Sequence, residues 1–129
     1  MKTFFKVALL STSIFLSVSH ASEPLEAAMK VLATNTKLFS KSSTSEDALV
    51  ALDEMKKAVL IAKENKPKKL KKLEETDAKV VAYEDKLKEL SSAIENAEQL
   101  VQEGKLDEAK KLSDQFNKIK KQGHRAFRF

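Results

Sequence analysis

Two side chains with donor atoms suited to iron stand near opposite ends of the sequence. Met29 carries a thioether sulfur and His124 an imidazole, and His124 is the only histidine beyond residue 21. A thioether and an imidazole that faced each other could bind a haem iron from both sides, an arrangement typical of electron-transfer haems. The plain alternatives are that Met29 fills a core gap and that His124 is solvated. Residue types alone leave both interpretations open.

Basic residues surround this histidine. Arg125 and Arg128 are the only arginines of the chain and flank His124, and Lys120 lies one helical turn earlier. Together they could pair with the propionate carboxylates of a haem, for which the forked guanidinium of arginine is well suited. Gly123 is unusual inside a helical segment, where glycine costs roughly 1 kcal/mol relative to alanine. It would either let a flat ligand approach the backbone or mark a fraying helix end.

Other chemistry finds little support in the sequence. The chain has no cysteine, which excludes disulfides, thiolate metal sites, iron–sulfur clusters and a thioether-linked haem. Gly104 and Gly123 stand alone, so there is no glycine-rich phosphate loop, and no nucleophile motif accompanies His124. Carboxylate pairs such as Asp53 and Glu54 lie among lysines and are typical of a solvated helix surface. We therefore do not expect an enzyme.

The first 21 residues have the order of a secretory signal peptide. Two lysines and no acid precede the apolar residues 7–18, and the small residues Ser19 and Ala21 follow. This apolar stretch is shorter than the ~20 residues that a membrane-spanning helix needs. The sequence predicts a cleaved signal peptide over residues 1–21 and one exported, soluble domain over residues 22–129, without stable membrane insertion. An uncleaved anchor is the alternative.

The charge of this mature domain is mild. Removal of Lys2 and Lys6 reduces the 24 basic residues to 22, against 19 acidic ones, and leaves a net charge of +3. A charge of this size does not indicate binding to nucleic acid.

The composition favours long helices, because the chain has only two glycines and two prolines. Apolar side chains recur at helical spacing in four stretches, at about residues 24–39, 43–65, 78–102 and from 105 toward the C-terminus. Ser43 and Glu46 have the spacing of a capping box at the start of the second helix, and Pro67 marks its end. The start of the third helix stays open, because Leu70 and Leu73 could extend it back toward Pro67.

Short connections make neighbouring helices antiparallel, so an all-α, up-down-up-down four-helix bundle is the simplest way to bury the four apolar stripes. In that topology the start of the first helix and the end of the fourth lie at the same end of the bundle. Met29 and His124 could therefore meet there. One bundle can bury all four stripes by itself, and we expect a monomer.

Four short blocks stand along the mature chain: LEAAM over residues 25–29, ALVALDEM over 48–55, PKKL over 67–70 and EGKLDEA over 103–109. With these blocks and the histidine near the C-terminus, residues 22–128 resemble the cytochrome b562 family of soluble, periplasmic four-helix-bundle haem proteins. The methionine and the histidine at the family's two axial-ligand positions are the most specific part of the resemblance. It implies that Met29 and His124 are the axial ligands of one b-type haem, held without a covalent bond.

The same resemblance assigns roles to neighbouring residues. Arg128 matches a basic position near the haem propionates, and Lys120 stands where the family pattern has arginine. Tyr83 and Leu87 replace two phenylalanines that pack near the haem. Gly123 replaces a bulky residue beside the histidine ligand.

The function implied by the resemblance is electron transfer in the periplasm, through transient contact with an unidentified redox partner protein. The alternative is a haem-free periplasmic helical bundle that acts as a binding or stress-response module. A run of five lysines within residues 66–72 is typical of a solvated connection. Its functional alternative is docking to an acidic redox partner or to an anionic membrane surface.

Overall fold

The four stretches with helical spacing form the long helices of the protein. The computed structural model describes residues 23–127. The helices are α1 (Glu23–Lys41), α2 (Ser45–Glu64), α3 (Lys68–Lys71), α4 (Ala78–Gln102), α5 (Leu106–Lys111) and α6 (Ser113–Phe127). Residues 23–127 contain no strand, so the predicted all-α class is confirmed.

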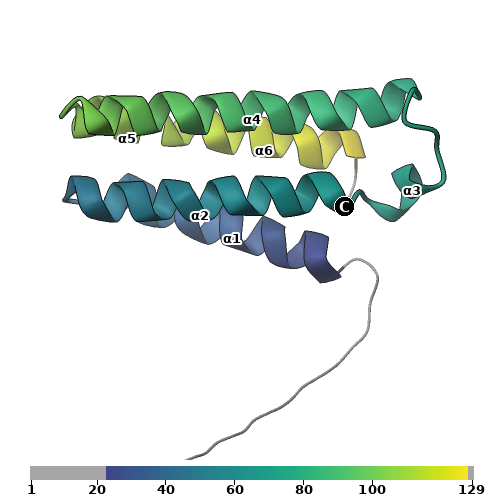
Figure 1. Cartoon of the computed structure of the whole chain (residues 1–129), viewed down its shortest axis with the longest axis horizontal. Helices are drawn as coiled ribbons and strands as arrows, with labels where there is room; N and C mark the ends of the chain where they lie inside the picture. The colour runs from purple at the N-terminus through teal and green to yellow at the C-terminus, as the bar shows by residue number, and fades with distance from the viewer. Residues whose placement is uncertain (1–22, 128–129) are drawn as a thin grey trace, which may run out of the picture.

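The long helices alternate in direction along the chain. In Figure 1, α1 runs away from the chain terminus, α2 returns, α4 runs outward again, and α5 and α6 turn back. α1 packs on α2, α2 on α4, α4 on α6 and α6 on α1, which closes a ring of four helices around one core. The start of α1 and the end of α6 consequently lie at the same end of the bundle (Figure 1).

The core is formed by one apolar stripe from each long helix. On α4, every residue of the predicted stripe is buried, namely Val80, Tyr83, Leu87, Leu90, Ile94, Ala97 and Val101. At the end of the bundle away from the chain termini, the buried rings of Phe39 and Phe116 have their centroids 5.7 Å apart. Burial of a phenylalanine side chain contributes about 1.5–3 kcal/mol, so this ring pair holds the end of α1 to the start of α6.

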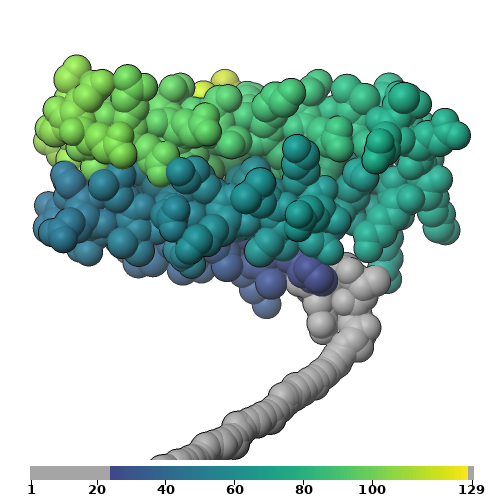
Figure 2. Space-filling model, viewed as in Figure 1, coloured from purple at the N-terminus to yellow at the C-terminus, as the bar shows by residue number. Residues whose placement is uncertain are grey.

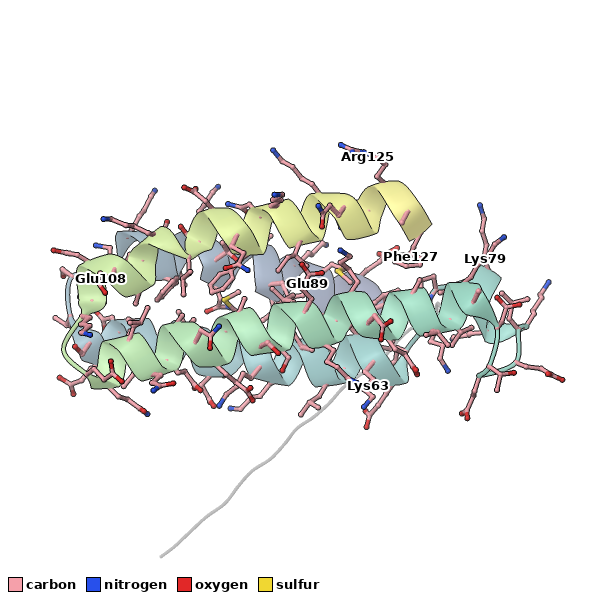
Figure 3. The ribbon with its side chains drawn as sticks, turned by 90° about the horizontal axis from the view of Figure 1, so that it is seen from above. Lys63, Lys79, Glu89, Glu108, Arg125 and Phe127 are labelled. Carbon is pink, nitrogen blue, oxygen red and sulfur yellow. The ribbon has the colours of Figure 1, made fainter. Side chains whose placement is uncertain are left out.

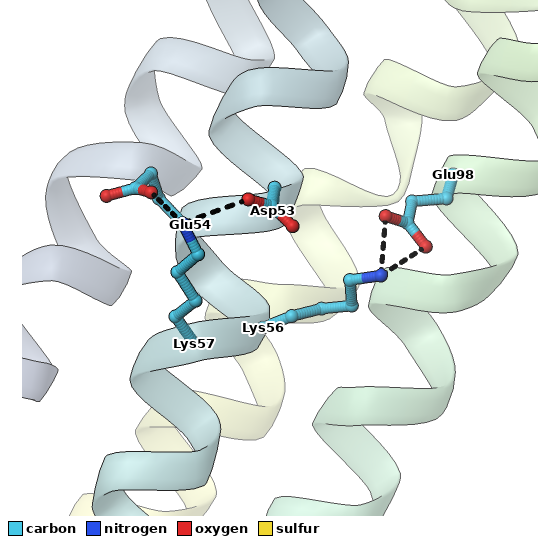
Figure 4. Close-up of polar contacts among 5 residues, drawn as sticks. All are labelled: Asp53, Glu54, Lys56, Lys57 and Glu98. Carbon is cyan, nitrogen blue, oxygen red and sulfur yellow. Dashed lines mark hydrogen bonds and ion pairs between the residues drawn. The ribbon is translucent and has the colours of Figure 1, made fainter.

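An ion pair joins α2 to α4 on the surface of the bundle (Figure 4). The Lys56 ammonium lies 2.9 Å from Oε2 and 3.0 Å from Oε1 of Glu98. This hydrogen bond raises the pKa of Lys56 above its usual value. The contribution linked to this raised pKa is present at neutral pH and is lost when alkaline pH deprotonates the lysine. Because both side chains are partly exposed, the contribution is small, about 0–1 kcal/mol.

The start of α2 differs from the predicted capping box. The N-cap is Thr44 and not Ser43, because the Thr44 hydroxyl accepts a hydrogen bond from the backbone N–H of Asp47 at 3.1 Å. The backbone of Thr44 is extended, with φ −128° and ψ 154°, as an N-cap requires. The predicted pairing begins one residue too early, since Thr44 and Asp47 repeat the spacing of Ser43 and Glu46.

The open start of the third predicted helix is now defined. Leu70 is buried inside the separate short helix α3, and α4 begins at Ala78. The Asp77 carboxylate caps α4 by accepting a hydrogen bond from the N–H of Lys79 at 2.8 Å. An acceptor at this position satisfies one of the free N–H groups of the first turn.

The predicted fourth helix is divided into α5 and α6 at Leu112. The N–H of Leu112 donates to the carbonyl of Ala109, three residues back, at 3.0 Å, which is the tighter hydrogen bond of a 3₁₀ turn. The chain then continues as α6, and the N–H of Phe116 donates to the carbonyl of Leu112 at 3.0 Å. The predicted fourth helix is therefore interrupted at Leu112, but the chain continues in the same direction through α5 and α6.

The predicted signal peptide, residues 1–21, lies outside the described residues and stays a prediction. Among the helices of residues 23–127, none is both long enough and apolar enough to cross a membrane.

The position of the α2 cap gives a direct test by substitution. Thr44→Ala removes the acceptor of the Asp47 N–H and should lower the free energy of unfolding by about 1 kcal/mol. Ser43→Ala is the matched control and should change it by less than about 0.5 kcal/mol. Urea denaturation followed by circular dichroism measures both. A larger loss of unfolding free energy in Ser43→Ala than in Thr44→Ala would show that Ser43 is the cap, as the sequence predicted.

Candidate functional site

A pocket opens between α1, α4 and α6 near the end of the bundle where the chain termini lie. Its walls are formed by Met29 and Leu32 of α1, Tyr83, Lys86, Leu87 and Leu90 of α4, and Ile119, Lys120, Gly123, His124 and Phe127 of α6. Three helices that are far apart in the sequence thus contribute to one site. Antiparallel packing places them together, as the bundle topology predicts.

The pocket is narrow in this structure. Its cavity volume is about 30 Å³, close to the share of one water molecule in the liquid. Leu32, Leu90 and Ile119 belong to the buried core, whereas Met29 and His124 are half-buried and exposed, respectively. A large flat ligand could therefore enter only if side chains of the pocket wall moved apart.

The structure brings three of the predicted site residues to this pocket. Met29 lines it from α1, and Lys120 and His124 line it from α6. Arg125 is exposed and is not part of the wall. Its side chain points away from the bundle in Figure 3, whereas the ring of Phe127 is turned toward α4. Arg128, the remaining predicted site residue, lies outside the described residues.

The protonation state of His124 suits the imidazole to donate a nitrogen lone pair to a metal ion. Partial desolvation at the pocket, followed by the positive charge of Lys120, lowers the pKa of His124 below its usual value. The imidazole is therefore neutral at pH 7, which is the form that binds a metal. No cluster of three or more His, Cys, Asp or Glu side chains arranged to hold a metal ion occurs within residues 23–127.

Tyr83 ties the wall of the pocket to two other helices. Its hydroxyl donates to the carbonyl oxygen of Ala62, in the last turn of α2, at 2.6 Å. Its ring meets the ring of Phe127 edge-on, with centroids 5.4 Å apart and an interplanar angle of 89°. This arrangement is a favourable aromatic contact. Burial raises the pKa of Tyr83 far above its usual range, so the phenol keeps its proton and stays a donor.

Lys86 is the wall residue that the sequence did not point to. Its ammonium lies 2.9 Å from Oε1 of Gln122 on α6 and 2.9 Å from Oε1 of Glu89. Its Cγ is 3.6 Å from where a Cβ on residue 123 would stand. Gly123 is buried within α6, which continues to Phe127, and so does not mark a fraying end. That distance is an ordinary van der Waals contact, so the stem of Lys86 packs beside Gly123 and an alanine there would fit without displacing it.

A family model described as Cytochrome b562 matches residues 24–128, which include all of the helices described above except Glu23, the first residue of α1. The chain belongs to the cytochrome b562 family. This is a family of four-helix-bundle, haem-binding electron-transfer proteins, and membership implies a b-type haem. The bundle predicted from the apolar stripes is thus also the bundle of the family.

The residues at the cytochrome b562 pocket have donor chemistry that fits such a group. A haem supplies four nitrogen ligands in its own plane, so its iron needs only two more from the protein. The pocket offers one thioether, from Met29, and one neutral imidazole, from His124, which is a known axial pair. The apolar wall suits the macrocycle, and Lys86 and Lys120 supply cations at the same pocket.

The contact of Tyr83 with α2 gives a prediction about the pocket wall. Tyr83→Phe keeps the ring but leaves the Ala62 carbonyl without this donor, and should lower the free energy of unfolding by about 1–3 kcal/mol. Tyr83→Leu also removes the edge-on contact with Phe127 and should cost more. Urea denaturation of the two variants measures the difference. Equal stability of Tyr83→Phe and the parent chain would contradict this account.

Proposed function

We propose that this chain binds one non-covalent b-type haem between Met29 and His124 and carries single electrons. One observation supports the proposal above all others: the two side chains come from opposite ends of the sequence and line the same apolar pocket. Each is the only residue of its type in the pocket wall. A role as core filler explains Met29, but it does not explain why a neutral imidazole stands at the same pocket.

Two protein ligands on one iron favour electron transfer over catalysis. The bound haem would supply an iron that alternates between its ferric and ferrous states, at a potential raised by methionine ligation. Met29 and His124 would fill both axial positions, so neither position stays open for a substrate. Because the ligands sit on helices held by the core, they would move little when the charge changes. We therefore assign no enzymatic activity to the chain.

The cations at the pocket have a role in this proposal as well. Lys86 and Lys120 line the wall and are placed to pair with the propionate carboxylates. Lys86 would exchange its contact with Glu89 for one of these carboxylates. We assign Arg125 no direct contact, because its side chain points outward, and Arg128 keeps the role that the family pattern gives it.

The cellular setting follows from the sequence. Residues 1–21 would direct export to the periplasm and be removed, and the mature chain would act there as a monomer. It would meet its redox partner protein by brief contacts, as electron carriers require.

Substitution of the two ligands tests the proposal. The haem-loaded mature chain should show a low-spin absorption spectrum, and Met29→Leu and His124→Ala should each convert it to a high-spin spectrum while the helical circular dichroism is kept. Imidazole added to the His124→Ala variant should restore part of the low-spin form. The reason is that each variant removes one axial ligand and leaves the other.

Met55 provides the matched control. It is fully buried on α2, where its sulfur lies 3.9 Å from the Thr36 hydroxyl, and it does not line the pocket. Met55→Leu should leave the spectrum unchanged and cost less than about 1.5 kcal/mol in stability. Low-spin spectra that persist in both ligand variants would refute the assignment of Met29 and His124 as ligands. A parent chain that stays helical but binds no haem would favour the haem-free binding module.

A further inference from the structure

A second hollow adjoins the haem pocket and lies beneath α3. The groove has a volume of about 580 Å³ and is partly open to solvent. Its floor is apolar and includes Leu70 and Leu73, the first turns of α4, and Phe127 at the end of α6. Lys69 and Lys79 form part of its wall. We call this hollow the α3 groove.

The α3 groove lies beside an unusually concentrated positive charge. Residues 66–72 contain five lysines, of which four are exposed and Lys66 is half-buried. Glu74, Glu75 and Asp77 follow in the same connection, so residues 66–79 have six basic and three acidic side chains and a net charge of +3. Across residues 23–127, no carboxylate forms an ion pair with any of these five lysines or with Lys79. In Figure 2 the α3 segment lies at the right-hand end of the molecule.

The opposite end of the bundle has no such charge. Residues 103–111, which connect α4 to α5 and form α5, contain three acidic and three basic side chains. In Figure 3, Glu108 lies at that end, whereas Lys79 and Phe127 lie at the end with the groove. The charge is therefore asymmetric along the long axis, and its positive side coincides with the pocket.

Phe127 is the wall shared by the two hollows. It lines the haem pocket on one side and the α3 groove on the other, and its ring contacts Tyr83 in the pocket. A protein seated on the groove would thus be separated from the haem pocket by a single side chain. Outer-sphere electron transfer slows steeply with distance, so this end of the bundle is the favourable place for contact.

From these observations we infer that the α3 groove and its lysines form the docking surface for an acidic electron-transfer protein. The inference rests on the proposed function and names the surface that function uses. A bound haem would supply the redox chemistry: one electron would be exchanged with the redox centre of the partner, in the direction set by their potentials, and no bond would form or break. The lysines attract the partner and orient it with its acidic face over Phe127.

Charge reversal at each end of the bundle tests this inference on the haem-loaded mature chain. The test variant is Lys68→Glu/Lys69→Glu/Lys71→Glu, and the matched control is Lys105→Glu/Lys110→Glu/Lys111→Glu. Both change the net charge equally, but the control residues lie on and beside α5, away from the groove. The absorption spectrum is recorded first, since a chain without haem fails the proposed function before any rate is measured.

Stopped-flow oxidation of the reduced protein by hexacyanoferrate(III) probes the surface with a small anion. Each turnover converts one ferrous haem to ferric and one hexacyanoferrate(III) to hexacyanoferrate(II). At low ionic strength the rate should fall about tenfold or more in the test variant and less than threefold in the control. The difference should shrink in 0.5 M salt, where screening is strong. Equal losses in both variants would overturn the inference.

An acidic plant-type ferredoxin then serves as a model protein partner. Its electron-exchange rate with the parent chain should fall in the test variant and persist in the control. Sedimentation with vesicles that contain phosphatidylserine tests whether the α3 groove binds an anionic membrane surface instead of a protein. Vesicle binding that depends on the α3 lysines, together with ferredoxin rates that are the same in all three proteins, would replace the protein partner with a membrane surface and overturn the inference.

Discussion

The pocket end of the molecule depends on two contacts of Tyr83, one hydrogen bond and one aromatic contact. Its hydroxyl reaches the last turn of α2 and its ring contacts Phe127 at the end of α6, while its own backbone belongs to α4. One buried side chain thus holds three helices in a fixed relation. Without this link, the last turns of α6 would lose their main aromatic contact, and these turns carry His124. The geometry of the site therefore rests on a residue that is not itself a ligand.

The two ends of the bundle are built for different purposes. The far end is closed by the tilted ring pair of Phe39 and Phe116, and Thr44 caps α2 there. The near end holds a narrow pocket whose inner wall belongs to the core and whose outer wall consists of longer, more exposed side chains. A rigid closed end lets the open end rearrange around a ligand without loss of the fold. The candidate pocket, the basic segment, the start of α1 and the end of α6 share the near end.

Much of the fold could be predicted from periodicity, because each apolar stripe needs only its own helix to be recognised. The stripe of α4 and its bounds, 78–102, are examples. The N-cap of α2 could not be predicted in this way. Ser43 with Glu46 and Thr44 with Asp47 have the same spacing, and the structure is needed to show that Thr44 is the cap. The meeting of Met29 and His124 at one pocket was predictable from the bundle topology, whereas their role as ligands stays a proposal. The place of Lys86 could not be predicted, because its ammonium reaches Gln122 on another helix and no spacing in the sequence reports a contact between α4 and α6.

The most direct test of the central claim is a titration of the purified mature chain with haem, followed by a reduced-minus-oxidised absorption spectrum. Binding between a thioether and an imidazole predicts saturation at one haem per chain and sharp low-spin bands on reduction. Helical circular dichroism, recorded on the same sample, reports the bundle. Absence of sharp bands while the helical signal stays intact would contradict the account, because the fold would then be present without the site that it is argued to build.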